Sequence, residues 1–119
     1  MMDVSEFERW FNQAVHTYDS AKRDHEDTDF DWACFKCQQA AEFALKAFLR
    51  GVGKLGIGHS LMKLTKEIEA LDIDVDEIRK CALTLEKFYI PRGTRMFMLR
   101  EVLMSFMMLK KLKKLWIAV

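Results

Sequence analysis

Apolar residues recur at intervals of three and four along most of the chain, and this spacing is typical of one face of an α-helix. The first such segment starts at Val4 and reaches Ala21. The polar run of residues 23–31 follows it and carries no apolar repeat. We therefore expect an amphipathic first helix that this run ends. Its apolar positions are Val4, Phe7, Phe11, Ala14, Val15, Tyr18 and Ala21.

A second helix is predicted from Asp31 to Gly51, and alanine dominates its apolar face. Small side chains let neighbouring helices approach closely, so we expect this helix at the centre of the fold. A carboxylate of Asp29 or Asp31 can cap its start. Gly51 is suited to end it in a left-handed conformation. The apolar face comprises Ala33, Cys37, Ala40, Ala41, Ala44, Leu45 and Phe48.

Two shorter helices are predicted next. Ser60 can cap a helix whose buried side includes Leu61, Leu64, Ile68 and Leu71. The acidic run of residues 72–76 forms a turn before a fourth helix, which Pro91 ends because proline disfavours helical backbone in the preceding residue. The buried side of that fourth helix comprises Ile78, Cys81, Ala82, Leu85 and Phe88.

The last predicted helix, from about Arg95 to Ile117, is apolar on most of its sides. Its broad face holds Met96, Leu99, Val102, Leu103, Phe106, Leu109, Leu112 and Trp116, and Met98, Met104, Met107 and Met108 extend it. A helix of this kind is buried on several sides. We expect it to pack against a second subunit in a homodimer; the alternative is a central core helix in a monomer.

These segments predict an all-α fold, an up-and-down bundle of four to five helices. A chain of 119 residues fits one domain, residues 1–119. No apolar run approaches the ~18 residues of a membrane span. The chain starts without a basic region followed by an apolar core, and its three cysteines are an odd number. We therefore expect a cytoplasmic protein without membrane contact.

Charge is distributed unevenly behind a net charge of +1. Residues 1–31 carry nine acids and three bases, residues 32–86 carry eight of each, and residues 87–119 carry one acid and eight bases. The basic last quarter can meet an anionic partner. It can equally meet the acidic first quarter, within one chain or across a dimer.

Two short motifs suggest chemistry that their context does not support. Residues 51–56 match G-x-G-x-x-G, but a helix precedes them where a dinucleotide-binding fingerprint needs a strand. Cys34 and Cys37 form a C-x-x-C pair, but only Cys81 and scattered histidines remain to complete a zinc site. We expect the cysteines to be small core residues, and we predict neither a metal site nor a cofactor.

The segment FYIPRGTR, residues 88–95, interrupts the helical pattern. Pro91 and Gly93 allow a sharp turn, and the guanidinium groups of Arg92 and Arg95 can bind phosphate bidentately. Tyr89 can stack on a base. The alternative is that both arginines pair with the acidic first quarter or with backbone carbonyls.

A second predicted anion contact lies where the third helix starts. The free N–H groups of a helix N-terminus attract anions, and His59 and Ser60 stand there; a flexible connection with a serine cap is the alternative. With Lys54 of the glycine-containing loop, these residues complete the predicted binding set. Its members are Arg92, Arg95, Tyr89, His59, Ser60 and Lys54.

Three segments together resemble the HEPN domain, the higher eukaryotes and prokaryotes nucleotide-binding domain. They are DWACFKCQQAAEFALKAFL, then GHSL after a glycine-containing loop, then FYIPRGTR. The resemblance covers essentially the whole chain in order. It implies a helical up-and-down bundle, often dimeric, that binds nucleotide or nucleic acid. It also implies a partner, a minimal nucleotidyltransferase, in a two-component system of the toxin–antitoxin kind.

Many HEPN proteins are metal-independent ribonucleases with an arginine and, four to six residues on, a histidine near the start of a late helix. Here no histidine follows Arg92, Arg95 or Arg100, and Arg9 with His16 matches only on the first helix. We therefore expect a non-catalytic nucleotide- or RNA-binding module. A ribonuclease with a non-standard partner for arginine, and a purely structural oligomerisation module, are the alternatives.

Overall fold

The computed structural model describes residues 2–86 and 95–119, with the side chains of the last helix described from Leu99 onward. These residues form five α-helices and no strand. The predicted all-α bundle is confirmed. The helices are α1 (Val4–Glu26), α2 (Phe30–Gly51), α3 (Leu61–Glu69), α4 (Asp76–Glu86) and α5 (Arg95–Ala118).

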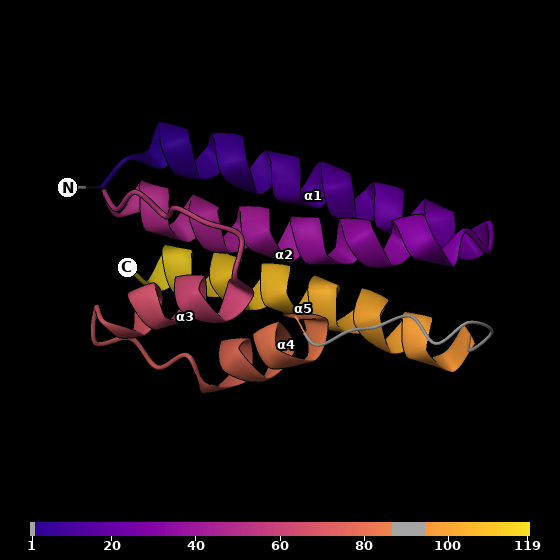
Figure 1. The fold of residues 1–119 in the computed structure, drawn as a ribbon. Helices are drawn as coiled ribbons and strands as arrows, with labels where there is room; N and C mark the ends of the chain where they lie inside the picture. The colour runs from indigo at the N-terminus through magenta and orange to yellow at the C-terminus, as the bar shows by residue number, and fades with distance from the viewer. Residues whose placement is uncertain (1, 87–94) are drawn as a thin grey trace.

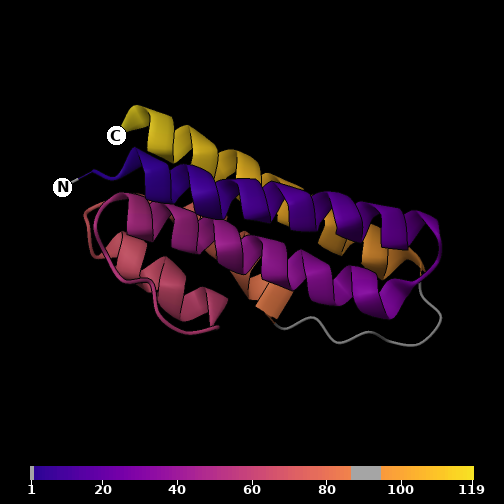
Figure 2. The same cartoon turned by 90° about the horizontal axis from the view of Figure 1, so that it is seen from above.

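The bundle is elongated, with principal extents of 46 × 24 × 23 Å. Figure 1 shows α1 and α2 as an antiparallel pair, with α5 beside α2 and running in the same direction as α2. The two short helices α3 and α4 lie together on the side of the bundle away from α1 (Figures 1 and 2). Both chain termini lie at one end (Figure 1).

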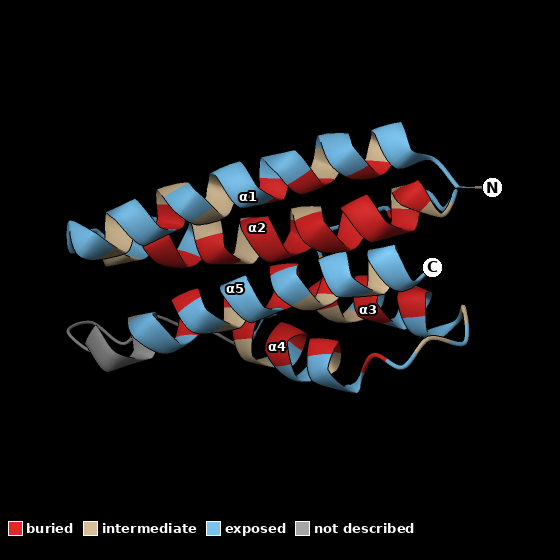
Figure 3. Ribbon diagram, turned by 180° about the vertical axis from the view of Figure 1, so that it is seen from behind, coloured by how far each residue is buried: buried red, intermediate tan, exposed pale blue. Residues whose placement is uncertain are grey.

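The core is built on alanine, as the alanine-rich second segment predicts. Ala14 and Ala21 of α1 and Ala33, Ala40 and Ala44 of α2 are fully buried. Their short side chains allow the long helices to pack closely. Figure 3 shows that the buried residues face the interior along α2, whereas the outer side of α1 is exposed.

The ends of α1 and α2 differ from the predicted ends. Helix α1 continues to Glu26 through the first half of the polar run, where Arg23 and Glu26 are good helix formers. Thr28 then takes a positive φ of 61° and turns the chain. Asp29 precedes α2 without a side-chain hydrogen bond to it, so the predicted carboxylate cap is wrong.

Gly51 has a different role from the predicted one. It is the last residue of α2, as predicted, but the positive φ, of 85°, belongs to Gly53. A Cβ added to Gly51 would come 2.5 Å from the Trp116 ring of α5. That ring stacks on Phe7 of α1 with the centroids 4.3 Å apart. Gly51 is therefore a contact point where three helices meet.

Helix α5 is buried on one side and apolar on the opposite side as well. The buried side includes Val102, Ser105, Met108, Leu109 and Leu112, and the Ser105 hydroxyl donates to the Cys37 carbonyl of α2 over 3.1 Å. Four large apolar residues form an exposed α5 stripe, with exposed fractions of 39–52%. These are Leu99, Leu103, Phe106 and Met107. In the part of the chain that the structure describes, no helix has the length and apolar character to span a membrane.

Candidate functional site

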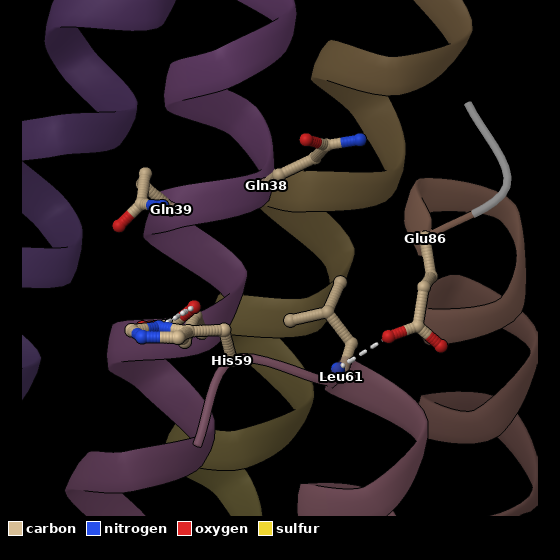
Figure 4. A pocket seen from close by; sticks show the side chains of 6 residues that line it. Gln38, Gln39, His59, Leu61 and Glu86 are labelled. Atoms are coloured by element: carbon tan, nitrogen blue, oxygen red, sulfur yellow. Dashed lines mark hydrogen bonds and ion pairs between the residues drawn. The ribbon is translucent and has the colours of Figure 1, made fainter. Parts of the chain in front are cut away.

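A polar cavity lies where α2, the start of α3 and the end of α4 come together. Its volume is about 200 Å³. Figure 4 shows two glutamine side chains from α2, His59 and Leu61 from the start of α3, and Glu86 from the end of α4 around it. The lining residues are Gln38, Gln39, Glu42, His59, Leu61 and Glu86.

A buried carboxylate holds the histidine of this cavity. Glu42 is 4% exposed, and its Oε2 lies 3.2 Å from Nδ1 of His59 and 3.1 Å from Nζ of Lys46. A carboxylate only accepts hydrogen bonds, so Nδ1 of His59 carries the hydrogen and donates it. The side chain of His59 is otherwise 87% exposed, which leaves Nε2 free to meet a ligand.

Two N–H groups in the first turn of α3 donate to protein side chains. The N–H of Leu61 donates to Oε1 of Glu86 over 2.8 Å, and the N–H of Lys63 donates to the Ser60 hydroxyl over 3.2 Å. Ser60 is thus the helix cap, and a carboxylate stands where a phosphate would accept the N–H of Leu61. These N–H groups do not form an open anion site.

The glutamines are fixed to different degrees. Nε2 of Gln38 donates to the Leu85 carbonyl at the end of α4 over 2.8 Å. This bond fixes the direction of the amide, so its Oε1 is left as an acceptor. Gln39 is half-buried on the same helix. This hydrogen bond also links α2 to the end of α4. It therefore helps to position Glu86, the next residue of α4, in the cavity wall.

The structure brings together part of the predicted binding set. His59 lines the cavity and Ser60 stands beside it, whereas Lys54 is exposed and does not line it. Tyr89 and Arg92 lie outside the described residues, as does the side chain of Arg95. The segment that contains them begins directly after Glu86, a residue of the cavity wall.

Sequence reasoning missed four polar lining residues, namely Gln38, Gln39, Glu42 and Glu86. A local signal existed for three of them, because the polar residues of QQAAE interrupt an alanine-rich helix. Glu86 gave no such signal. Its contact with Leu61 joins residues 25 positions apart, which only the folded chain brings together.

The cysteine pair behaves as predicted. Cys34 is 6% exposed and Cys37 is fully buried, both against the helical core. Burial raises the pKa of each thiol to about 12, so neither forms a thiolate at neutral pH. The interpretation as core residues is confirmed.

Helix α5 carries a buried carboxyl group, that of Glu101. Glu101 is 2% exposed, and its Oε2 has no hydrogen-bond partner among the described residues. Burial raises the pKa of this carboxyl to about 7, and Arg100 offsets the increase only in part. Glu101 is therefore expected to titrate near neutral pH.

Ion pairs among the described residues lie both within helices and between them. Arg9 pairs with Glu6, and Lys36 pairs with Asp24 over 2.7 Å. On α5, Lys111 pairs with Glu77 of α4. This lysine of the basic last quarter therefore meets the middle of the chain, and not the acidic first quarter.

Comparison with known proteins gives a consistent result. The family model described as HEPN domain matches residues 7–93. A structure of a protein from Thermus thermophilus is 29% identical, with a TM-score of 0.78 over 91% of this chain and 96% of that chain. A HEPN domain protein from Thermotoga maritima is 27% identical, with a TM-score of 0.83 over 93% and 99% of the two chains.

An archaeal HEPN homologue of known structure is similar as well. It is 26% identical to this chain, with a TM-score of 0.75 over 96% of this chain and 98% of that chain. None of the curated proteins matches the sequence.

Proposed function

Since this chain belongs to the HEPN domain family, we propose that it is a nucleotide- or RNA-binding module of the cytoplasm. The observation that carries the proposal is the polar cavity beside Glu86. It offers amide, imidazole and carboxylate groups to a ligand, and the segment with Tyr89, Arg92 and Arg95 begins at its wall. We propose that the cavity and this segment bind the two ends of one nucleotide.

In this proposal the phosphate lies with the arginines and not at the start of α3. The N–H groups of Leu61 and Lys63 already have protein partners, and Glu86 would repel an anion there. Arg92 and Arg95 supply the guanidinium groups that phosphate prefers, and Tyr89 supplies a stacking surface. Ser60 contributes as the cap of α3 directly after His59, and Lys54 attracts the RNA strand from outside the cavity.

The test is a titration of labelled ATP and of a short single-stranded RNA at two salt concentrations. We expect saturable binding that weakens at the higher salt concentration, because phosphate contacts release counterions. The variant Arg92→Ala/Arg95→Ala should lose this binding. The matched control is Lys22→Ala/Arg23→Ala, which removes the same charge from exposed positions of α1. Equal losses in both variants would mean that only net charge matters.

A ribonuclease is the second candidate, and one observation favours it. Glu42 orients His59 so that Nε2 faces solvent, and this is the arrangement that a general base needs. The family's arginine–histidine spacing is absent around His59, because Arg50 is too far from it in sequence. Cleavage of RNA in the presence of EDTA, lost in His59→Ala, would establish this activity.

We also propose a homodimer formed through the exposed α5 stripe, Leu99, Leu103, Phe106 and Met107. Large apolar side chains spaced along one helix face are typical of a surface that another helix covers. A minimal nucleotidyltransferase is proposed as a further partner, on the family resemblance alone. Co-expression of the neighbouring reading frame and affinity purification would test that partnership. The absence of binding and of cleavage in an intact dimer would leave a purely structural module.

A further inference from the structure

The cavity is too small for a whole nucleotide. Pockets for drug-sized ligands have volumes of about 300–1,000 Å³, whereas this one has about 200 Å³. One flat part of a nucleotide fits, and the rest must lie outside. The carboxylate of Glu86 in the wall excludes the phosphate end by repulsion. If the proposed function holds, the part inside the cavity is the base.

The polar atoms left open in the cavity are mainly acceptors. Glu86 uses Oε1 to accept the N–H of Leu61, and Oε2 is left over. Gln38 uses one of its two Nε2 hydrogens on the Leu85 carbonyl, so its Oε1 and one N–H are left. Glu42 is already occupied by His59 and Lys46. A bound base must therefore present hydrogen-bond donors to Glu86 and Gln38.

An exposed aromatic ring shares a face of α2 with the glutamines of the cavity. Phe35 is 51% exposed and lies one turn of α2 before Gln38 and Gln39, at helical spacings that share a face. A base can stack on such a ring, whatever its identity. Stacking on Phe35 would thus add affinity for any base, and the hydrogen-bond acceptors would determine which base binds most tightly.

We infer that this cavity is a base-recognition site that prefers guanine, on the basis of the acceptors Glu86 and Gln38. The guanine edge carries an N1–H and a 2-amino group side by side, so it presents more adjacent donors than adenine, cytosine or uracil. A carboxylate pairs well with two such donors. A base without the 2-amino group leaves an acceptor unmatched, and uracil presents a single N–H.

The experiment compares four ligands by calorimetric titration of the full chain: GMP, IMP, AMP and UMP. IMP is the matched ligand, because it lacks only the 2-amino group of GMP. We expect GMP to bind roughly tenfold more tightly than IMP or more, since one hydrogen bond to a charged acceptor is of that order, and UMP to bind most weakly. Equal affinities for GMP and IMP would overturn the inference.

Two isosteric variants test whether Glu86 is responsible for the preference for guanine. Glu86→Gln should lower GMP affinity roughly tenfold, by the same single charged hydrogen bond, and should lower UMP affinity by less, so that the preference for GMP over UMP shrinks. Glu67→Gln removes the same charge from an exposed position of α3 outside the cavity and should change neither. A GMP preference that survives in Glu86→Gln would also overturn the assignment.

The outcomes separate this inference from the proposed function. Binding of all four nucleotides with one affinity supports a nucleotide-binding module and removes base recognition. Binding of none of them removes both. The ligand comparison on the unaltered chain decides the question even if a variant fails to fold.

Discussion

Nδ1 of His59 lies 3.2 Å from the buried Oε2 of Glu42, so a carboxylate inside α2 fixes a ring that is almost fully open to solvent. The same carboxylate pairs with Lys46, which is 8% exposed. Glu42 therefore neutralises a buried cation on one side and orients a surface histidine on the other. We expect the two contacts to contribute different amounts to the free energy of unfolding.

The first prediction compares the contributions of these two contacts to stability. Glu42→Gln should destabilise the fold by about 3 kcal/mol, because it leaves the buried Lys46 ammonium without a counter-charge. His59→Ala should cost less than about 1 kcal/mol, because the histidine contact is exposed on one side. Urea unfolding followed by circular dichroism measures both.

A double variant provides the control for that prediction. Glu42→Gln/Lys46→Met removes both charges and should recover most of the lost stability, since an apolar replacement of a buried pair is often neutral. If the double variant is as unstable as Glu42→Gln, the loss has a cause other than the unpaired Lys46.

Apolar spacing predicted the helices because each helix must bury one face, and that requirement is local in sequence. Ser60 was identified as a cap for the same reason, since its partner Lys63 is three residues away. Gly51 was assigned the wrong role because the reason for it is the Trp116 ring, which belongs to the last helix. Local sequence rules predict where a helix ends. They do not predict which side chain of a distant helix packs against a glycine.

The candidate site was less predictable than the fold. His59 was found from its place at a helix start, but the sequence analysis did not single out its partner Glu42. The carboxylate of Glu86 was the least predictable, because helices α3 and α4 had to pack before it could reach Leu61. Polar residues within an alanine-rich helix were the one sequence signal that pointed to the cavity.

The second prediction concerns pH. Burial raises the pKa of Glu101 to about 7 in the folded chain, above its ordinary value of 4.5. Between these values the folded state holds a proton that the unfolded state has released, so stability falls as pH rises through this window. The loss should reach at most about 3 kcal/mol and should level off above pH 7.

Glu101→Gln should abolish that dependence, because an amide does not titrate. Urea unfolding of both proteins at pH values from 5 to 8 gives the comparison, with the exposed Glu67→Gln as a control for a change of net charge. An unfolding free energy that depends on pH equally in Glu101→Gln and in the parent chain would show that Glu101 ionises without cost.

The third prediction concerns Gly51, where helices α1, α2 and α5 are in contact. Gly51→Ala should destabilise the fold by about 1–3 kcal/mol, because the new methyl group overpacks the contact with Trp116. This sign is opposite to the usual effect of alanine inside a helix, which is stabilising by about 1 kcal/mol. Thermal unfolding measures the change.

A second substitution identifies the cause. Trp116→Leu makes room for the methyl group, so Gly51→Ala should cost less in that background than in the parent chain. Costs that simply add would indicate that the two residues do not interact.

The fourth prediction concerns the exposed α5 stripe. Leu103 is 50% exposed and sits between Leu99 and Phe106 on this face. Leu103→Glu should convert a dimer into a monomer, because a charge at the centre of an apolar interface loses its hydration. Stability of the monomer should change by less than about 1 kcal/mol, since the side chain is a surface group within one chain. Sedimentation equilibrium measures the mass.

The control for this surface is Leu55→Glu, which places the same charge on a 72% exposed leucine of the loop between α2 and α3. It should leave the dimer intact, because the loop is not part of the stripe. Dissociation by both variants would point to a general effect of negative charge. A parent chain that sediments as a monomer at all concentrations would instead assign the stripe to a different partner, and Leu103→Glu would then be expected to weaken that complex.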